Sequence, residues 1–233
     1  MPSALNPSAL MLFAAGFGTR MGALTADRPK PLVEVAGRPL IDHALALRDD
    51  FGPLRTVANL HYRGDQLRRH LQGRDVLFSE ETPEILETGG GLRKALPLLA
   101  SNPVFTMNTD AAWTGTNPLI QLAEAWDPAR MDALLLLIAP ERARGHAGGG
   151  DFLMAPDGSL KRGPGAIYSG VQILKTDLLD SIPEPAFSLN LLWDAMLRQG
   201  RLHGVMHAGG WCDVGRPESI PLAEAMLAEA ADV

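Results

Sequence analysis

Only one cysteine, Cys212, occurs among the 233 residues, so no disulfide can form within the chain. A single free thiol fits a reducing compartment, and we expect a cytoplasmic protein. A chain of this length can bury enough apolar surface to be stable without covalent bridges. Because no histidine adjoins Cys212 in the sequence, we do not expect it to be a catalytic thiol.

Long apolar runs and net positive charge are also absent. The run at residues 133–139 (ALLLLIA) is far shorter than the roughly 20 residues that cross a bilayer. Residues 1–9 carry two prolines and no lysine or arginine, which argues against a secretory signal. The formal net charge of −6 argues against general binding to nucleic acid or to an anionic membrane. An anionic ligand would therefore need a local cluster of basic residues.

Apolar runs alternate with amphipathic stretches, which predicts an α/β fold with a mostly parallel, Rossmann-like sheet and helices on both faces. A Gly/Arg-rich loop and a hairpin after Pro140 predict a small β-rich insertion. We expect a single domain over residues 1–233. The expected strands are 10–15, 54–60, 75–79, 104–107, 133–139, 152–154, 160–162, 166–174 and 203–207, and the expected helices are 40–48, 64–71, 91–99, 118–126, 189–197 and 220–231.

A glycine turn with basic residues follows the first expected strand. Residues 16–20 read GFGTR, and Lys30 stands between Pro29 and Pro31. Ligands of open α/β sheets bind beyond the carboxyl ends of the strands, and glycines let backbone approach a phosphate closely. Met21 stands where a GxGxxG motif needs its third glycine, and no Walker motif is present. The segment predicts a phosphate-binding turn; the alternative is a tight turn with solvated basic residues.

A second glycine-rich segment, residues 87–91 (ETGGG), precedes the helix expected at 91–99. Consecutive glycines cost backbone entropy, and they are useful where a flat ring lies against backbone. The sequence thus favours a loop that binds a ring. A flexible loop, or a helix that starts at Thr88, remains the alternative.

Two aspartates from distant parts of the chain are candidate metal ligands, one at the end of an expected strand and one flanked by apolar residues. Asp110 ends the sequence Asn108-Thr109-Asp110, and Asp213 lies within residues 211–215 (WCDVG). Two carboxylates suffice for Mg²⁺ when phosphates supply further oxygen ligands. A strand-ending Asx turn is the alternative for Asp110. No cysteines and histidines have zinc-site spacing, and no GxSxG motif occurs.

Taken in order, these motifs resemble those of the sugar-1-phosphate nucleotidyltransferases. The matching segments are residues 14–21 (AAGFGTRM), Thr25, 29–32 (PKPL), 35–40 (VAGRPL), 59–62, 87–91, 108–110 and 211–215. The resemblance covers nearly the whole chain and implies a glycosyltransferase-A-like nucleotidyltransferase fold. The segments LETGGGL, RKALPLL, GDF and YSGV are most similar to the short N-acetylmuramate-1-phosphate uridylyltransferases. Because the chain ends soon after residue 215, we expect no left-handed β-helix domain.

The resemblance implies a Mg²⁺-dependent enzyme that joins a nucleoside triphosphate and a sugar 1-phosphate, releasing pyrophosphate. UTP and N-acetylmuramate 1-phosphate, as used in peptidoglycan recycling, are the expected substrates. The alternatives are a mannose-1-phosphate guanylyltransferase, a glucose-1-phosphate thymidylyltransferase or uridylyltransferase, and a non-catalytic nucleotide-binding regulator on the same fold. The oligomeric state stays open.

The resemblance also carries residue roles. Arg20 and Lys30 would be catalytic, and Asp110 and Asp213 would hold Mg²⁺. Ala23 and Thr109 stand where the family usually has proline and often glycine, and Arg28 receives no role. The expected nucleotide-binding residues are Ala14, Ala15, Gly16, Gly18, Thr19, Arg20, Lys30, Asn59, Glu87, Thr88, Gly89 and Gly90, and those facing the sugar phosphate are Asp151, Ser169 and Gly170.

Overall fold

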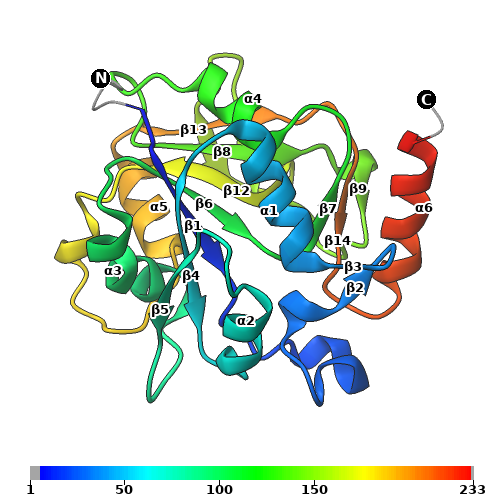
Figure 1. Cartoon of the computed structure of the whole chain (residues 1–233). Helices are drawn as coiled ribbons and strands as arrows, with labels where there is room; N and C mark the ends of the chain where they lie inside the picture. Colours follow the sequence, from blue (N-terminus) through cyan, green and yellow to red (C-terminus); the bar gives the residue numbers. More distant parts are fainter. Residues whose placement is uncertain (1–5, 232–233) are drawn as a thin grey trace.

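The computed structural model describes residues 6–231, so residues 1–5 of the segment considered for a secretory signal, and residues 232–233, lie outside the described part. Its centre is a seven-stranded sheet in the order β13-β8-β12-β6-β1-β4-β5 (Figure 1). All neighbouring pairs are parallel except those of β12, which is antiparallel to both β6 and β8. The prediction of a mostly parallel sheet is confirmed. The strands are β1 (Ala9–Phe13), β4 (Arg55–Leu60), β5 (Leu77–Glu80), β6 (Val104–Asn108), β8 (Ala133–Ile138), β12 (Ile167–Leu174) and β13 (Leu202–Met206).

Helices cover both faces of this sheet, as predicted. Side chains of α1 (Leu40–Phe51), α2 (Gly64–His70) and α4 (Pro118–Ala125) pack in one apolar cluster. Those of α3 (Glu87–Leu99) and α5 (Asn190–Arg198) pack in the other.

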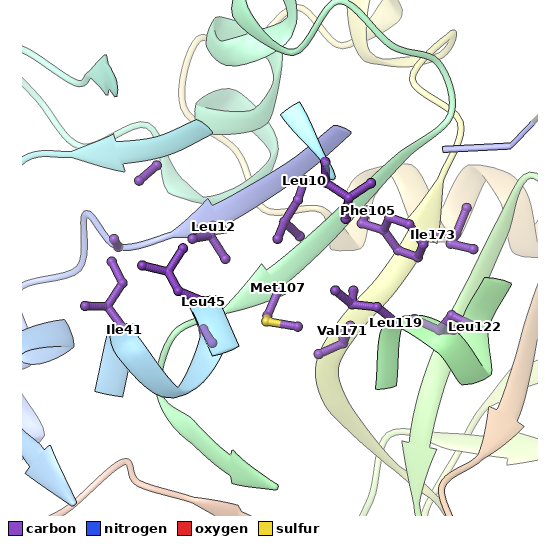
Figure 2. Packing of buried hydrophobic residues seen from close by; sticks show 14 of the residues in the cluster. Leu10, Leu12, Ile41, Leu45, Phe105, Met107, Leu119, Leu122, Val171 and Ile173 are labelled. Atoms are coloured by element: carbon purple, nitrogen blue, oxygen red, sulfur yellow. The ribbon is translucent and has the colours of Figure 1, made fainter. Parts of the chain in front are cut away.

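The central strand β1 contributes alternate side chains to the two faces. Leu10 and Leu12 lie in the cluster with α1, whereas Met11 lies in the cluster with α3. Figure 2 shows Leu10 and Leu12 on the side that holds Leu45 of α1. Because each fully buried side chain of this kind contributes about 1.5–3 kcal/mol, the central strand is firmly fixed. Its carboxyl end is therefore a rigid base for the glycine turn.

A second, three-stranded sheet lies beside α6 (Ser219–Ala231), in the order β7-β14-β9 (Figure 1). Its strands are β7 (Ala111–Trp113), β14 (Trp211–Asp213) and β9 (Ala143–Arg144). The sequence did not predict this sheet, because strands of two or three residues leave no periodic pattern. Its core includes Met21, so the glycine turn is anchored under α6.

The predicted hairpin after Pro140 is confirmed as β10 (Phe152–Met154) and β11 (Leu160–Arg162). A second small hairpin joins β2 (Glu34–Val35) to β3 (Arg38–Pro39). Short 3₁₀ helices complete the fold: η1 (Thr19–Thr25), η2 (Lys30–Leu32), η3 (Pro140–Arg142) and η4 (Leu179–Ser181). Within residues 6–231, no helix combines the length and apolarity required to span a membrane.

Candidate active site

A cavity of about 210 Å³ opens where β1, β4 and β6 end. It brings together many residues that were expected from the sequence to bind substrate, from five separate parts of the chain. The lining residues are Phe13, Ala14, Ala15, Gly16, Lys30, Pro31, Asn59, Glu81, Ile85, Glu87, Thr88, Asn108, Thr109 and Asp110.

The glycine turn needs its second glycine for backbone and packing reasons. Gly18 has a φ of 65°, and a Cβ there would lie 2.9 Å from Cβ of Lys30. The Thr25 hydroxyl donates a 2.9 Å hydrogen bond to the Gly18 carbonyl and closes the turn. Around Gly16, no heavy atom of the described chain beyond its neighbours stands within 4 Å of an added Cβ. A ligand can thus approach the backbone at Gly16, while Gly18 lets Lys30 pack closely.

Side chains after β4 hold the far end of the turn. Tyr62 Oη donates to the Thr25 carbonyl at 2.9 Å, and Arg63 Nη2 donates to the Ala26 carbonyl at 2.6 Å. These bonds fix the turn at Thr25 and Ala26. Arg28 is exposed and pairs with its neighbour Asp27 at 3.3 Å. It does not line the 210 Å³ cavity.

Lys30 and Asp110 form an ion pair at the cavity wall. Lys30 Nζ lies 2.7 Å from Oδ2 of Asp110, with side chains that are 11% and 29% exposed. Pro29 and Pro31 on either side of the lysine are buried, which fixes its backbone. The structure therefore holds one positive and one negative group together at the carboxyl edge of the sheet.

Asp110 and Asp213 are brought close by the small sheet. In the ladder of β7 and β14, Asp213 is opposite Ala111, and the Val214 amide donates a 2.8 Å hydrogen bond to the Asp110 carbonyl. Burial and then the negative charge of Asp110 raise the pKa of the Asp213 carboxyl, against the opposing effects of Lys30, Arg20 and His146. A cation between the two carboxylates would relieve this repulsion.

These two carboxylates fit a Mg²⁺ site that substrate completes. Among residues 6–231, no three His, Cys, Asp or Glu side chains gather into a preformed metal cluster. Magnesium commonly takes one or two carboxylates and draws its remaining ligands from water and substrate phosphates. The donor set therefore suits Mg²⁺ bound together with a phosphorylated substrate.

Asn59 and Glu81 form a buried network under the cavity. Asn59 Oδ1 accepts a 2.6 Å hydrogen bond from the Ala14 amide, and Asn59 Nδ2 donates to Glu81 Oε1 at 2.7 Å. Glu81 Oε2 accepts a hydrogen bond from the Leu86 amide at 2.7 Å, and Glu81 is fully buried. Glu81 was not expected to be buried, because an acid at the end of a strand normally faces solvent. Asn59 lines the cavity and positions the end of β1 with its side chain, and its contact with a nucleotide stays a prediction.

Replacement of Glu81 by glutamine should lower the free energy of unfolding by about 1–3 kcal/mol. The glutamine amide would present a donor where Asn59 Nδ2 or the Leu86 amide already donates, so one buried donor loses its acceptor. Urea unfolding measures the change, with the exposed Glu84→Gln as the matched control. Equal stability of both variants would show that the network is not fully formed.

The structure corrects the expectation of a glycine loop at residues 87–91, because α3 begins at Glu87 and includes all three glycines. The amides of Gly89 and Gly90 both donate to the Phe187 carbonyl, at 2.8 and 3.2 Å. A Cβ on Gly89 would collide with the Phe187 ring, and one on Gly90 with the Pro185 carbonyl. These glycines therefore admit a neighbouring chain segment, and their amides are not free to read a base edge. Glu87, with a φ of 57°, and Thr88 line the cavity instead.

The three residues expected to face the sugar lie around β12. Gly170 has a φ of 90°, and a Cβ there would lie 2.9 Å from Nδ2 of Asn108. The buried Ser169 accepts a 3.1 Å hydrogen bond from the Trp211 indole at its carbonyl. Asp151 Oδ2 accepts from the Tyr168 amide at 2.8 Å. Ser169 and Gly170 therefore join the ends of β6 and β14, and contact with a sugar stays a prediction for all three.

Thr109, where the family often has glycine, donates a 2.9 Å hydrogen bond to the Phe13 carbonyl and joins the ends of β6 and β1. Cys212 is fully buried, and burial together with Asp213 raises the pKa of its thiol to about 11. The expectation that this cysteine is not a nucleophile agrees with these properties.

Arg20 is separated from the 210 Å³ cavity. It lines a second cavity, of about 250 Å³, together with Asp213, His146 and Arg216. Thr19 is exposed at the start of η1 and lines neither cavity. Lys30 thus lines one cavity with Asp110, and Arg20 lines the other with Asp213. His146 and Arg216 had no signal in the sequence, because single basic residues in a loop carry no motif.

The chain is similar in sequence and in fold to several known proteins. Residues 10–147 match the family described as the MobA-like NTP transferase domain. The chain is 40% identical to the N-acetylmuramate alpha-1-phosphate uridylyltransferase of Caulobacter vibrioides, over 96% of this chain and 98% of that protein. It is 34% identical to the protein of that name from Neisseria meningitidis serogroup B, over 93% and 96% of the two chains.

More distant similarity extends to other members and to solved structures. A mannose-1-phosphate guanylyltransferase catalytic subunit beta of Drosophila melanogaster is 28% identical over 93% of this chain and 62% of its own length. HddC of Yersinia pseudotuberculosis, solved with GMP-PN, superimposes with a TM-score of 0.74 at 22% identity, covering 94% and 99% of the two chains. The similarity to HddC establishes the fold. The chain therefore belongs to the MobA-like NTP transferase family, and it is an enzyme of the sugar-1-phosphate nucleotidyltransferase type.

Proposed function

We propose that this enzyme transfers the uridylyl group of UTP to N-acetylmuramate 1-phosphate in the cytoplasm, as a step of peptidoglycan recycling. The observation that carries the proposal is the group of Lys30, Asp110 and Asp213 at the carboxyl edge of the sheet. The similarity to two proteins with this activity over almost their full lengths supports the choice of substrates.

In the proposed reaction, an oxygen of the sugar 1-phosphate forms a bond to the α-phosphorus of UTP. The bond from that phosphorus to the oxygen bridging the β-phosphate breaks, and pyrophosphate leaves. The attacking oxygen is already an anion, so no protein nucleophile is required. The main task of the protein is to bring two anionic substrates together and to stabilise the charge that develops at the α-phosphate.

Lys30 is the group placed to stabilise that charge. Its backbone lies between two buried prolines and its ammonium pairs with Asp110, so little reorganisation is needed when the phosphate arrives. The glycine turn, through Gly16 and Gly18, would carry the triphosphate, and Arg20 would face the leaving pyrophosphate. Asp110 and Asp213 would hold Mg²⁺, which when bound polarises the phosphoryl oxygens.

The remaining assignments concern the base and the sugar. Glu87 and Thr88 line the cavity after β1 and β4, where a base would lie against Ala14 and Ala15. Asn59 would act on this site by fixing the Ala14 amide. Asp151, Ser169 and Gly170 would border the sugar side.

A substrate panel tests the proposal. Release of pyrophosphate with Mg²⁺ should be fastest for UTP with N-acetylmuramate 1-phosphate, among UTP, GTP, dTTP and ATP combined with the 1-phosphates of N-acetylmuramate, N-acetylglucosamine, mannose and glucose. A preference for GTP with mannose 1-phosphate would contradict the proposal and would identify the enzyme as a mannose-1-phosphate guanylyltransferase. Nucleotide binding without turnover on any sugar phosphate would indicate a regulator.

A further inference from the structure

The second cavity contains basic residues that the proposed reaction does not use. It is about 250 Å³ in volume and lies between the glycine turn, the end of β14 and the loop after β9. Its lining residues are Arg20, Gly145, His146, Ala147, Gly148, Asp213, Gly215 and Arg216. Of these, the proposed reaction employs Arg20 and Asp213.

The charges around this cavity favour an anion. Two guanidinium groups and an imidazole face a single carboxylate, that of Asp213. Among the ion pairs of residues 6–231, none involves Arg20 or Arg216. A guanidinium offers several donors in one plane, which matches the oxygens of a phosphate or a carboxylate.

The loop that carries His146 is fixed against the active-site strand. Gly145 has a φ of 70°, and a Cβ there would collide with the Asp213 carbonyl, so the loop lies directly on β14. A Cβ on Gly148 would collide with Nε2 of His146, so the loop folds closely around the imidazole. The ring centroid of His146 lies 6.1 Å from that of Trp211. These contacts hold the imidazole beside Asp213 rather than in solvent.

We propose that His146 and Arg216 complete, together with Arg20, a second oxyanion site that binds a phosphate or carboxylate group of a substrate. This proposal depends on the proposed function, because both candidate ligands are groups of the substrates in that reaction. One is the pyrophosphate part of UTP, which Arg20 would face in the proposed reaction. The other is the lactyl carboxylate, which N-acetylmuramate carries and N-acetylglucosamine lacks.

Calorimetry with Mg²⁺ tests the site without any need for turnover. The probes are inorganic pyrophosphate, N-acetylmuramate 1-phosphate and N-acetylglucosamine 1-phosphate, titrated into the wild type, Arg216→Gln and His146→Gln. The exposed Arg198→Gln on α5 is the matched control. We expect each cavity variant to bind at least one probe about 10-fold more weakly, as for loss of a charge-assisted hydrogen bond.

The pattern of losses identifies the ligand group. Weaker binding of pyrophosphate alone supports a site for the leaving group. Weaker binding of N-acetylmuramate 1-phosphate, with N-acetylglucosamine 1-phosphate unchanged, supports a site for the carboxylate. Equal losses for both sugar phosphates support a site for the sugar's own phosphate.

Affinities within about twofold of the Arg198→Gln control, for every probe that binds the wild type, would overturn the proposal. Thermal unfolding of each variant confirms that it is folded. The pyrophosphate titration involves no sugar, so its result is independent of whether the panel above identifies N-acetylmuramate 1-phosphate as substrate.

Discussion

Replacement of Asp110 by asparagine should lower kcat/KM by at least about 10²-fold while the protein remains folded. Asparagine keeps the size of the side chain and its hydrogen bonding to Lys30, but it removes the charge that would hold Mg²⁺ together with Asp213. Loss of one oriented charged group at a phosphoryl-transfer site has an effect of this size. The measurement is the initial rate of pyrophosphate release at saturating Mg²⁺, with UTP and the best sugar phosphate of the panel.

The control is Asp180→Asn, which removes an exposed carboxylate in η4 and should keep wild-type activity. Circular dichroism and thermal unfolding confirm that Asp110→Asn is folded, which is expected because the Asp110 side chain is partly exposed. Turnover near the wild-type value in Asp110→Asn would remove Asp110 from the catalytic site and, with it, the proposed role of the carboxylate pair.

Replacement of Gly89 by alanine should lower the free energy of unfolding by about 1–3 kcal/mol. In an exposed helix interior, the same substitution would be stabilising by roughly 0.5–1 kcal/mol. Here the added methyl group would meet the buried Phe187 ring and would stand 2.9 Å from the Phe187 carbonyl. The expected sign of the effect is therefore opposite to that of helix propensity. Urea unfolding measures it, with the exposed Lys94→Ala of the same helix as the control.

This prediction separates packing from direct ligand contact. If the glycines formed a loop that touches the base, Gly89→Ala would weaken nucleotide binding and leave stability near that of the wild type. The structure predicts a stability defect, since both Gly89 and Gly90 donate to the Phe187 carbonyl. A stable Gly89→Ala variant with weakened nucleotide affinity would contradict the packing role.

The main sheet was predictable because its strands are rich in apolar residues, as in β1 and β8, and most of them alternate with amphipathic helices. Residues 133–139 correspond to β8 with a difference of one residue at the end. The small sheet escaped prediction, since β9 has two residues and β14 has three. It forms through pairing between distant segments, and no local pattern reports such pairing.

Residues of the site were predictable where they occur in motifs, as for Lys30 between prolines. Glu81 was missed because its burial depends on the distant partner Asn59 and on the turn that ends at Leu86. The three glycines were assigned to a loop because glycine disfavours helices. In the structure, close approach of residues 185–187 to Gly89 and Gly90, and of Glu81 to Gly91, outweighs this preference.

The ladder between β7 and β14 has a consequence for how the chain acquires activity. It pairs Ala111 with Asp213 across about a hundred residues of intervening chain, and it is the contact that sets Asp110 beside Asp213. The strand β14 follows β1, β6 and β7 in the chain, so this ladder cannot form until residues 211–213 have been synthesised. The seven-stranded sheet can assemble around β1 and β6 without it. Catalytic competence would then be the last property that a nascent chain gains, after the ribosome has released β14 and α6.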